Sequence, residues 1–381
     1  MKQSLSHLIQ SEFCLSSDII YLNHAAIAPW PNRSVEAVNN FAHENALLGS
    51  KNYMQWTEVE SRLREMMCEL INSPSPDDIA LLKNTSEALS VVAFGLDWKI
   101  GDNIVSTDQE FPSNRVVWQA LNDQGVELRQ ASLKNVQSPE DAIFSQVDEN
   151  TRLITVSSVQ YGSGLRLNLE KIGHFCSNHD ILFCVDAIQS IGAIQFDAQA
   201  IRADFVMADG HKWMLGPEGV ALFYCRKELR EQLRLFQYGW HMTDAFVDFD
   251  NQEWKPADSS RRFECGSPNM LGIHALSASL SLLQEIGMDT IETLVLDNTQ
   301  SLFNKINAQP ELDLITDNTP GRFGGIVTFR HRSLGNEKLF NHLTETGVMC
   351  APRGGGIRFS PHFYTTKEEI TRAVEIAATA S

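Results

Sequence analysis

The sequence predicts an α/β fold, in which a large domain with a mostly parallel sheet is followed by a smaller α+β domain. Short β-rich runs alternate with helix-like stretches, which is the pattern of parallel strands joined by crossover helices. Runs such as Ile181–Val185 are apolar without alternation, as expected for strands that helices cover on both faces. The length of 381 residues also favours two domains.

The expected elements follow this division. Strands of the large sheet are predicted at Asn103–Thr107, Leu153–Ser157, Ile181–Val185, Phe205–Ala208 and Gly219–Tyr224. The later part is predicted to contain a helix over Leu276–Leu296, the segment GGIVTFR, a helix near Glu337–Thr346, a strand near Gly356–Phe359 and a helix from Lys367. We therefore expect an N-terminal segment (1–20) that packs with the small domain, a large domain (21–270) and a small domain (271–381).

Composition excludes several classes of function. The formal net charge is −17, which disfavours binding to the phosphate backbone of nucleic acids. No apolar run approaches the roughly 18 residues of a membrane span, and we expect no signal peptide. The 7 cysteines are scattered without a CxxC pair, so we expect no metal site and a reducing, cytoplasmic environment.

Two charged residues follow neighbouring predicted strands. Asp186 ends one apolar run, and Lys212 lies just beyond the next. Ligands in open α/β sheets bind beyond the carboxyl ends of the strands, so both side chains would reach one crevice. A lysine that forms a Schiff base, paired with an aspartate at the pyridine nitrogen, is the arrangement used to hold pyridoxal phosphate. The alternatives are a helix cap for Asp186 and a solvated loop lysine for Lys212.

A third element would supply a phosphate site. The segment Asn84-Thr85-Ser86-Glu87 opens a helix-like run. Hydroxyl residues at a helix start are usually caps, but free N–H groups and the helix dipole there also bind phosphate. Together with Asp186 and Lys212, this segment predicts binding of the cofactor's phosphate.

These residues lie in motifs that resemble the class V aminotransferase family, which includes cysteine desulfurases and isopenicillin-N-epimerase-like proteins. The resemblance extends over nearly the whole chain. Its motifs, in order, are NTSEA (84–88), DQEFPSN (108–114), VDAIQSIG (185–192), DGHKWMLGPEG (209–219), RFECGSPN (262–269) and IRFSPHFYTT (357–366). It implies a fold type I pyridoxal-phosphate transferase that works as a homodimer.

The resemblance also implies roles for individual residues. The catalytic set would be Lys212, Asp186 and His211. Cofactor binding would fall to Thr85, Ser86, Phe111, Asp186, Gln189, His211, Lys212 and, across the dimer interface, Ser267. The substrate would be bound by Arg358, with His24 and Gln160 lining its pocket. Three of these roles have a purely structural alternative that stays open. Phe111 could be a core side chain, Gln189 could face the surface, and Arg358 could form a structural ion pair.

The chain departs from the desulfurase pattern at three places. Asp209 stands where many desulfurases have a phosphate-binding serine, and a carboxylate there would repel phosphate unless it turned away. Tyr161 and Gly162 replace an asparagine-containing segment. The stretch around Cys350 is shorter than the loop that carries the catalytic cysteine, so we predict that Cys350 is not a persulfide carrier.

The predicted function is therefore that of a pyridoxal-phosphate enzyme acting on a small amino acid through an external aldimine, with Lys212 as general acid and base. Transamination, β-elimination and epimerisation share the first steps, and the sequence does not separate them. The alternatives are a cysteine desulfurase-like carbon–sulfur lyase or an amino-acid epimerase and, in a different class, a non-catalytic protein that binds the cofactor.

Overall fold

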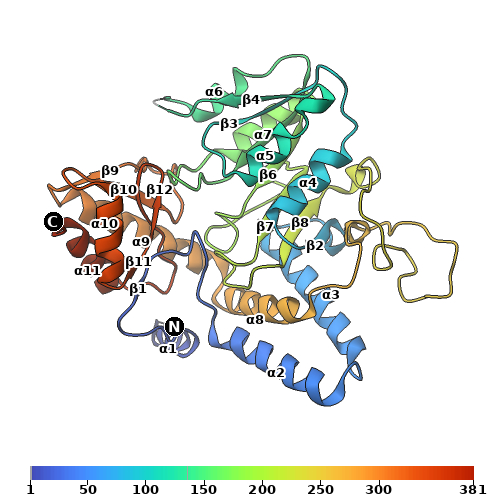
Figure 1. Ribbon diagram of the computed structural model, residues 1–381, viewed down its shortest axis with the longest axis horizontal. Coiled ribbons are helices and arrows are strands. Elements are labelled where there is room, and N and C mark those ends of the chain that lie inside the picture. Colours follow the sequence, from blue (N-terminus) through green and yellow to red (C-terminus); the bar gives the residue numbers. More distant parts are fainter. Residues whose placement is uncertain (1, 135) are drawn as a thin grey trace.

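The computed structural model describes residues 2–134 and 136–381. It contains a large sheet covered by helices, a smaller α+β unit beside it, and a long irregular segment between β8 and α8 that extends away from the large sheet (Figure 1). This is the predicted α/β architecture. No helix among the described residues is long and apolar enough to cross a membrane.

The large sheet has seven strands in the order β2-β8-β7-β6-β5-β3-β4. Their bounds are Ile79–Leu82 (β2), Asn103–Thr107 (β3), Glu127–Ala131 (β4), Thr151–Ser157 (β5), Leu182–Asp186 (β6), Phe205–Asp209 (β7) and Ala221–Cys225 (β8). The pairs among β4, β3, β5, β6 and β7 are parallel, whereas β8 runs antiparallel to both of its neighbours. The sheet is thus mostly parallel, as the sequence predicts.

Helices cover both faces of this sheet. They are α2 (Asn32–Leu48), α3 (Tyr53–Leu70), α4 (Thr85–Gly95), α5 (Ser113–Gln119), α6 (Pro139–Phe144), α7 (Leu169–Asn178) and α8 (Met270–Ile286). Neighbouring strand residues belong to different cores: Cys184 packs in the core under α4 and α5, and Val185 in the core with α3, α7 and α8. This two-sided burial explains why the β6 sequence is continuously apolar.

The small unit is built on an antiparallel sheet in the order β12-β13-β10-β9. Its elements are α9 (Met288–Asn307), β9 (Leu312–Leu314), β10 (Val327–His331), α10 (Asn336–Glu345), β11 (Val348–Met349), β12 (Ala351–Arg353), β13 (Gly356–Phe359) and α11 (Lys367–Ala378). The N-terminal segment contributes α1 (Lys2–Glu12) and β1 (Ile20–Tyr21). Strand β1 pairs in parallel with β11, which joins the start of the chain to the small unit.

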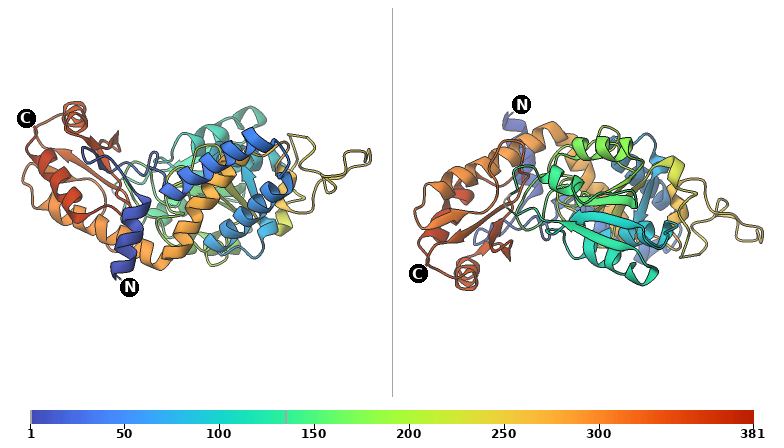
Figure 2. Two further views of the ribbon diagram at one scale, coloured as in Figure 1. Left: turned by 90° about the horizontal axis from the view of Figure 1, so that it is seen from below. Right: turned by 90° about the horizontal axis from the view of Figure 1, so that it is seen from above.

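The predicted single helix over Leu276–Leu296 is wrong. Gly287 separates α8 from α9, and its φ of +86° lies in the left-handed region that ends a helix. Helix α8 packs against α2 and α3 of the large unit, and Figure 2 shows α2 and α8 side by side. Within α9, Val295 packs in the hydrophobic core of the large unit, whereas Leu302 packs in the hydrophobic core of the small unit. The core of the large unit thus extends into α9, and the division near residue 270 stays a prediction.

Candidate active site

Asp186 and Lys212 meet at the carboxyl edge of the large sheet. Asp186 is the last residue of β6, and Lys212 follows the end of the parallel neighbour β7 by three residues. The strands are fixed by their buried apolar residues, so the polar residues that follow them share one edge. Both side chains are buried, with Asp186 2% and Lys212 9% exposed.

Burial shifts the protonation of both groups. It raises the pKa of Asp186 and lowers the pKa of Lys212, because a low dielectric disfavours each charged form. The opposite charge of each residue opposes the shift of the other, and the nearby Arg358 lowers the pKa of Lys212 further. The site thereby favours a neutral, nucleophilic amine. A cation placed against Asp186 would offset the cost of its charge.

Arg358 brings an unpaired positive charge to this site from the small unit. It lies on β13, is 3% exposed, and donates from Nη1 to the carbonyl oxygen of Tyr161 at 2.8 Å. Its Nε has no hydrogen-bond partner, and no carboxylate of the described residues lies within ion-pair distance. Burial lowers its pKa to about 10. Since buried charges are normally paired, this guanidinium is suited to an anionic ligand.

The start of α4 offers a second site for an anion. Asn84 caps the helix by accepting from the Glu87 amide at 2.9 Å, and Ser86 donates to the Ser113 hydroxyl at 2.8 Å. The buried Thr85 hydroxyl has no partner among the described residues. An unpartnered hydroxyl beside the free amides of a helix N-terminus fits a phosphate group.

His211 lies close to Asp209, the last residue of β7, just before Lys212. Their Nδ1 and Oδ1 atoms are 3.1 Å apart, yet the alignment is not that of a hydrogen bond, so each buried atom lacks a partner within the described structure. The Asp209 carboxylate thus faces the neighbouring imidazole.

The burial of Phe111 and Gln189 distinguishes the structural alternatives left open for them, a core position for Phe111 and a surface position for Gln189. The Lys212 Nζ lies 5.6 Å from the centre of the Phe111 ring, which is 40% exposed and therefore not a core side chain. Gln189 is buried rather than surface-facing. Its amide donates to the Ala25 carbonyl at 3.1 Å and accepts from Trp213 at 2.9 Å. Gln189 therefore retains one N–H for a ligand.

His24 and Gln160 are both buried, but only one has a free polar atom. The two ring nitrogens of His24 bond to the Ser360 carbonyl and the Tyr364 hydroxyl, at 2.8 and 2.6 Å. Gln160 donates to Glu110 at 2.9 Å, and its Oε1 lacks a partner among the described residues. The structure therefore joins His24 to residues of the small unit and leaves Gln160 Oε1 able to accept from a ligand, and the pocket-lining roles of both residues stay predictions.

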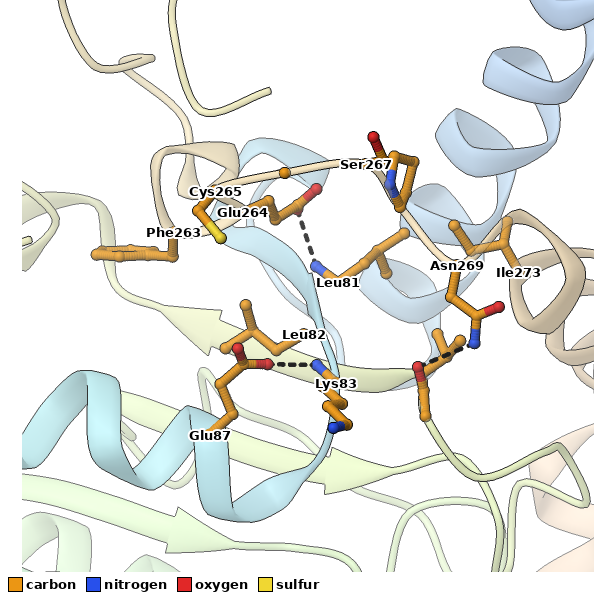
Figure 3. Close-up of a pocket in the computed structure, with 14 residues that line it drawn as sticks. Leu81, Leu82, Lys83, Glu87, Phe263, Glu264, Cys265, Ser267, Asn269 and Ile273 are labelled. Atoms are coloured by element: carbon orange, nitrogen blue, oxygen red, sulfur yellow. Dashed lines mark hydrogen bonds between the residues drawn. The ribbon is translucent and has the colours of Figure 1, made fainter. Parts of the chain in front are cut away.

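Ser267 lies apart from these residues. It is exposed and lines a pocket of about 370 Å³ whose lining includes neither Lys212 nor Asp186 (Figure 3). The same pocket is lined by Lys83 and Glu87, which flank the start of α4. The predicted contact of Ser267 with a phosphate in a second subunit stays a prediction.

Glu110 is a functional candidate that the sequence reasoning missed. This buried carboxylate accepts hydrogen bonds from Thr107, Asn114, Ser157 and Gln160. It fixes the ends of β3 and β5 and adds negative charge beside Asp186. A signal was present, because Glu110 follows a buried strand just as Asp186 does.

These features fit pyridoxal phosphate. A buried amine can hold its aldehyde, a buried carboxylate can face its ring nitrogen, and the start of α4 can hold its phosphate. Arg358 then remains for the carboxylate of a substrate.

Comparisons with known proteins agree with this geometry. Residues 20–373 match the family described as aminotransferase class V. A relative named "Probable cysteine desulfurase" from Methanothermobacter thermautotrophicus is 31% identical, with 95% of this chain and 94% of the relative covered. The "Uncharacterized aminotransferase YcbU" of Bacillus subtilis is also 31% identical, with 88% of each chain covered. A solved complex of the cystine C–S lyase C-DES with cysteine persulfide has a TM-score of 0.90 at 23% identity, covering 96% of this chain and 98% of that one.

Proposed function

Because this chain belongs to the aminotransferase class V family, we propose that its site transforms a small amino acid at the α-carbon. Family membership makes the chain a pyridoxal-phosphate-dependent enzyme. When bound, this cofactor supplies an aldehyde that condenses with amines and a ring that takes up electrons from the substrate. The proposal concerns the substrate and the residues that act on it.

Each part of the cofactor has a matching residue in the site. Lys212 would hold it covalently, and Asp186 would face the ring nitrogen. Thr85 and Ser86, together with His211, would bind the phosphate at the start of α4, and Phe111 would lie against the ring. Gln189 has one free N–H for the ring's phenolic oxygen. A protonated ring nitrogen would offset the burial cost of the Asp186 carboxylate.

One observation supports an α-amino acid as the substrate. Arg358 is a buried guanidinium without a carboxylate partner among the described residues, and it acts electrostatically on Lys212. A substrate whose amine would take the place of Lys212 on the cofactor and whose carboxylate would pair with Arg358 uses both positions, and an α-amino acid has that form. Once displaced from the cofactor, the neutral amine of Lys212 would take the proton from the substrate's α-carbon and return it.

A carbon–sulfur lyase acting on cysteine or cystine is the second candidate. The names of the desulfurase relatives and of the C–S lyase favour it. The described structure favours a form of this reaction without a persulfide on Cys350. That thiol is 6% exposed, and burial raises its pKa to about 12, whereas sulfur transfer needs an accessible thiolate.

We also infer a homodimer, in which Ser267 would contact the phosphate bound by the other subunit. Its exposed position beside the pocket at the start of α4 supports this assignment. Sedimentation of the purified protein should give twice the monomer mass, whereas a monomer at micromolar concentration would contradict the inference.

The test of function is a spectral screen of the cofactor-loaded protein against the common amino acids, with identification of products. Small amino acids should change the cofactor absorbance, and the products would separate transamination, elimination and epimerisation. Asp186→Asn should retain the covalent cofactor but lose about a hundredfold or more in α-proton exchange, since the neutral amide cannot stabilise a charged ring nitrogen. No response to any amino acid would overturn the proposal and favour a non-catalytic protein.

A further inference from the structure

The segment Gln160–Gly164 joins the two units of the molecule. Three successive carbonyl groups of this loop, which follows β5 of the large sheet, accept hydrogen bonds from side chains of the small unit. Tyr161 accepts from Arg358 at 2.8 Å, Gly162 from Thr328 at 2.6 Å, and Ser163 from Thr316 at 2.6 Å. The loop therefore fixes the small unit, and Arg358 with it, relative to the large sheet.

Two glycines make this approach possible. A Cβ at Gly354, whose φ is +62°, would lie 2.1 Å from the carbonyl oxygen of Gly162. A Cβ at Gly162 would lie 3.2 Å from the Cα of Gly354. Because the two backbones are in direct contact, the loop has little freedom to move away from the site.

The Tyr161 side chain lies at the site that this loop shapes. Its half-buried ring packs edge-on against Phe111, with ring centres 5.1 Å apart at an angle of 83°. Phe111 in turn lies 5.6 Å from the Lys212 Nζ. Tyr161 is also an electrostatic neighbour of Arg358. The two rings thus form an aromatic wall beside the lysine, and the Tyr161 carbonyl joins this wall to the arginine.

We propose that the Tyr161 ring determines which amino-acid side chains the site accepts. This inference rests on the proposed function, in which the substrate's amine goes to the position of Lys212 and its carboxylate to Arg358. Both groups sit on one carbon, so anchoring them fixes the origin of the side chain beside the aromatic wall. Small side chains fit next to the rings, and large ones meet Tyr161.

The backbone and side chain of Tyr161 then have separate roles. The carbonyl positions Arg358, and the ring limits the space for the substrate. Tyr161→Ala removes the ring but keeps the carbonyl that accepts from Arg358. The variant should therefore change the preference between substrates without weakening the hold on their carboxylate.

The experiment compares L-alanine with L-phenylalanine on the cofactor-loaded protein. One measurement is the concentration that gives half of the change in cofactor absorbance, and the other is kcat/KM for the reaction found in the screen. In Tyr161→Ala, both measures should improve for phenylalanine relative to alanine by about tenfold or more, while alanine alone changes by less than about threefold. Tyr161→Phe should retain the original preference, because the ring remains.

Phe144→Ala is the matched control, since Phe144 is also half-buried in an aromatic pair, with Phe175 on the far helices α6 and α7. Its preference should equal that of the unaltered protein. An unchanged preference in Tyr161→Ala, with the alanine response intact, would overturn the inference alone. Equal weakening for both amino acids would also overturn it and assign the ring to positioning Arg358. If the unaltered protein responds to no common amino acid in the screen, the proposed function fails and this inference with it.

Discussion

Two arginines with little solvent exposure have opposite surroundings, Arg64 with a side chain 12% exposed and Arg358, which is 3% exposed. Arg64, on α3, donates to the carboxylates of Glu60 and Glu264, at 2.8 and 2.6 Å, and to the carbonyl of Ile79 at 2.7 Å. Arg358, on β13, donates to one carbonyl and has no carboxylate within reach in the described structure. Burial lowers the pKa of Arg64, but Glu264 and Glu60 outweigh this effect, so the net shift is upward. For Arg358, burial prevails and the pKa falls to about 10.

The comparison separates charges that hold the fold from charges kept for a ligand. The Arg64 cluster is internally compensated: Glu264 also accepts from the Leu81 amide at 2.9 Å, and His241 lies 3.5 Å from Glu264. Glu60, His241 and Glu264 lie close enough together to suggest a metal site. Arg64 already uses both carboxylates, however, so the cluster needs no added cation. In that cluster, one buried atom, His241 Nδ1, lacks a hydrogen-bond partner among the described residues. Around Lys212, four residues keep such atoms: Thr85, Asp209, His211 and Arg358.

The largest effect is expected at Lys212. Lys212→Ala removes the amine that would hold the cofactor and move the proton, so activity should fall by about a thousandfold or more. Borohydride reduction of the unaltered protein should make the cofactor attachment at Lys212 permanent, and mass spectrometry of peptides would locate it. Attachment to another lysine would show that the uncompensated cluster is not the site.

Removing each arginine tests the comparison directly. Arg64→Ala leaves two buried carboxylates without a partner and should lower the free energy of unfolding by about 3–5 kcal/mol. Arg358→Ala removes a charge that the fold does not compensate, so the free energy of unfolding should change by less than about 1 kcal/mol. The measurement is denaturant unfolding, with Arg64→Lys as a milder variant should Arg64→Ala not fold.

The two arginine variants should show the opposite order of effects on catalysis. Arg358→Ala should raise KM for amino acids about tenfold to a hundredfold, which corresponds to the loss of a charge-assisted hydrogen bond. The KM for amines without a carboxylate should change much less. Arg64→Ala or its lysine variant should leave KM close to normal. Equal effects of Arg358→Ala on substrates with and without a carboxylate would assign Arg358 a structural role.

The sequence predicted the backbone of this site better than its side-chain environment. Strand β3 has the predicted bounds, and β6 and β7 differ from prediction by one residue at their ends, because runs of buried apolar residues leave few alternatives. The strand order then brings Asp186 and Lys212 together. The helix break at Gly287 was missed because a single glycine is tolerated within an apolar helical pattern.

Contacts between segments that are far apart in the chain could not be predicted from the spacing of residues in the sequence. The two nitrogens of His24 bond to Ser360 and Tyr364, more than three hundred residues later in the sequence. Glu110 accepts from its sequence neighbours Thr107 and Asn114 but also from Ser157, 47 residues later, and spacing does not predict this last contact. Such hydrogen bonds depend on tertiary packing, so the sequence alone cannot distinguish a ligand-binding polar group from a compensated one.

A smaller effect, on stability at acidic pH, is expected from two buried histidines, His24 and His362. Burial lowers the pKa of His24 to about 4 and that of His362 well below its usual value. The unfolded chain, with histidine pKa values near about 6.5, therefore binds more protons below that pH, and stability should fall as the pH decreases. His24 alone should cost about 2 kcal/mol between pH 6.5 and 5.

Thermal unfolding at pH 7 and pH 5 would measure this loss. Asparagine can replace the Nδ1 donor of His24 to Ser360 but does not titrate, so His24→Asn should be less stable at pH 7 and less sensitive to acid. The exposed His179 provides the control, because His179→Asn should retain the original pH dependence. An undiminished acid sensitivity in His24→Asn would show that other groups cause it.

The smallest effect is expected at Cys350, where burial acts on a nucleophile in the opposite sense from Lys212. Burial favours the neutral form of both groups, which is the reactive form of an amine but the unreactive form of a thiol. Cys350 packs in the core of the small unit, directly between β11 and β12, so no mobile loop can carry it to a substrate. Cys350→Ser should therefore keep substantial activity. Mass spectrometry after incubation with cysteine should find no persulfide on Cys350, and a persulfide there, with loss of sulfide production in the serine variant, would restore the desulfurase mechanism.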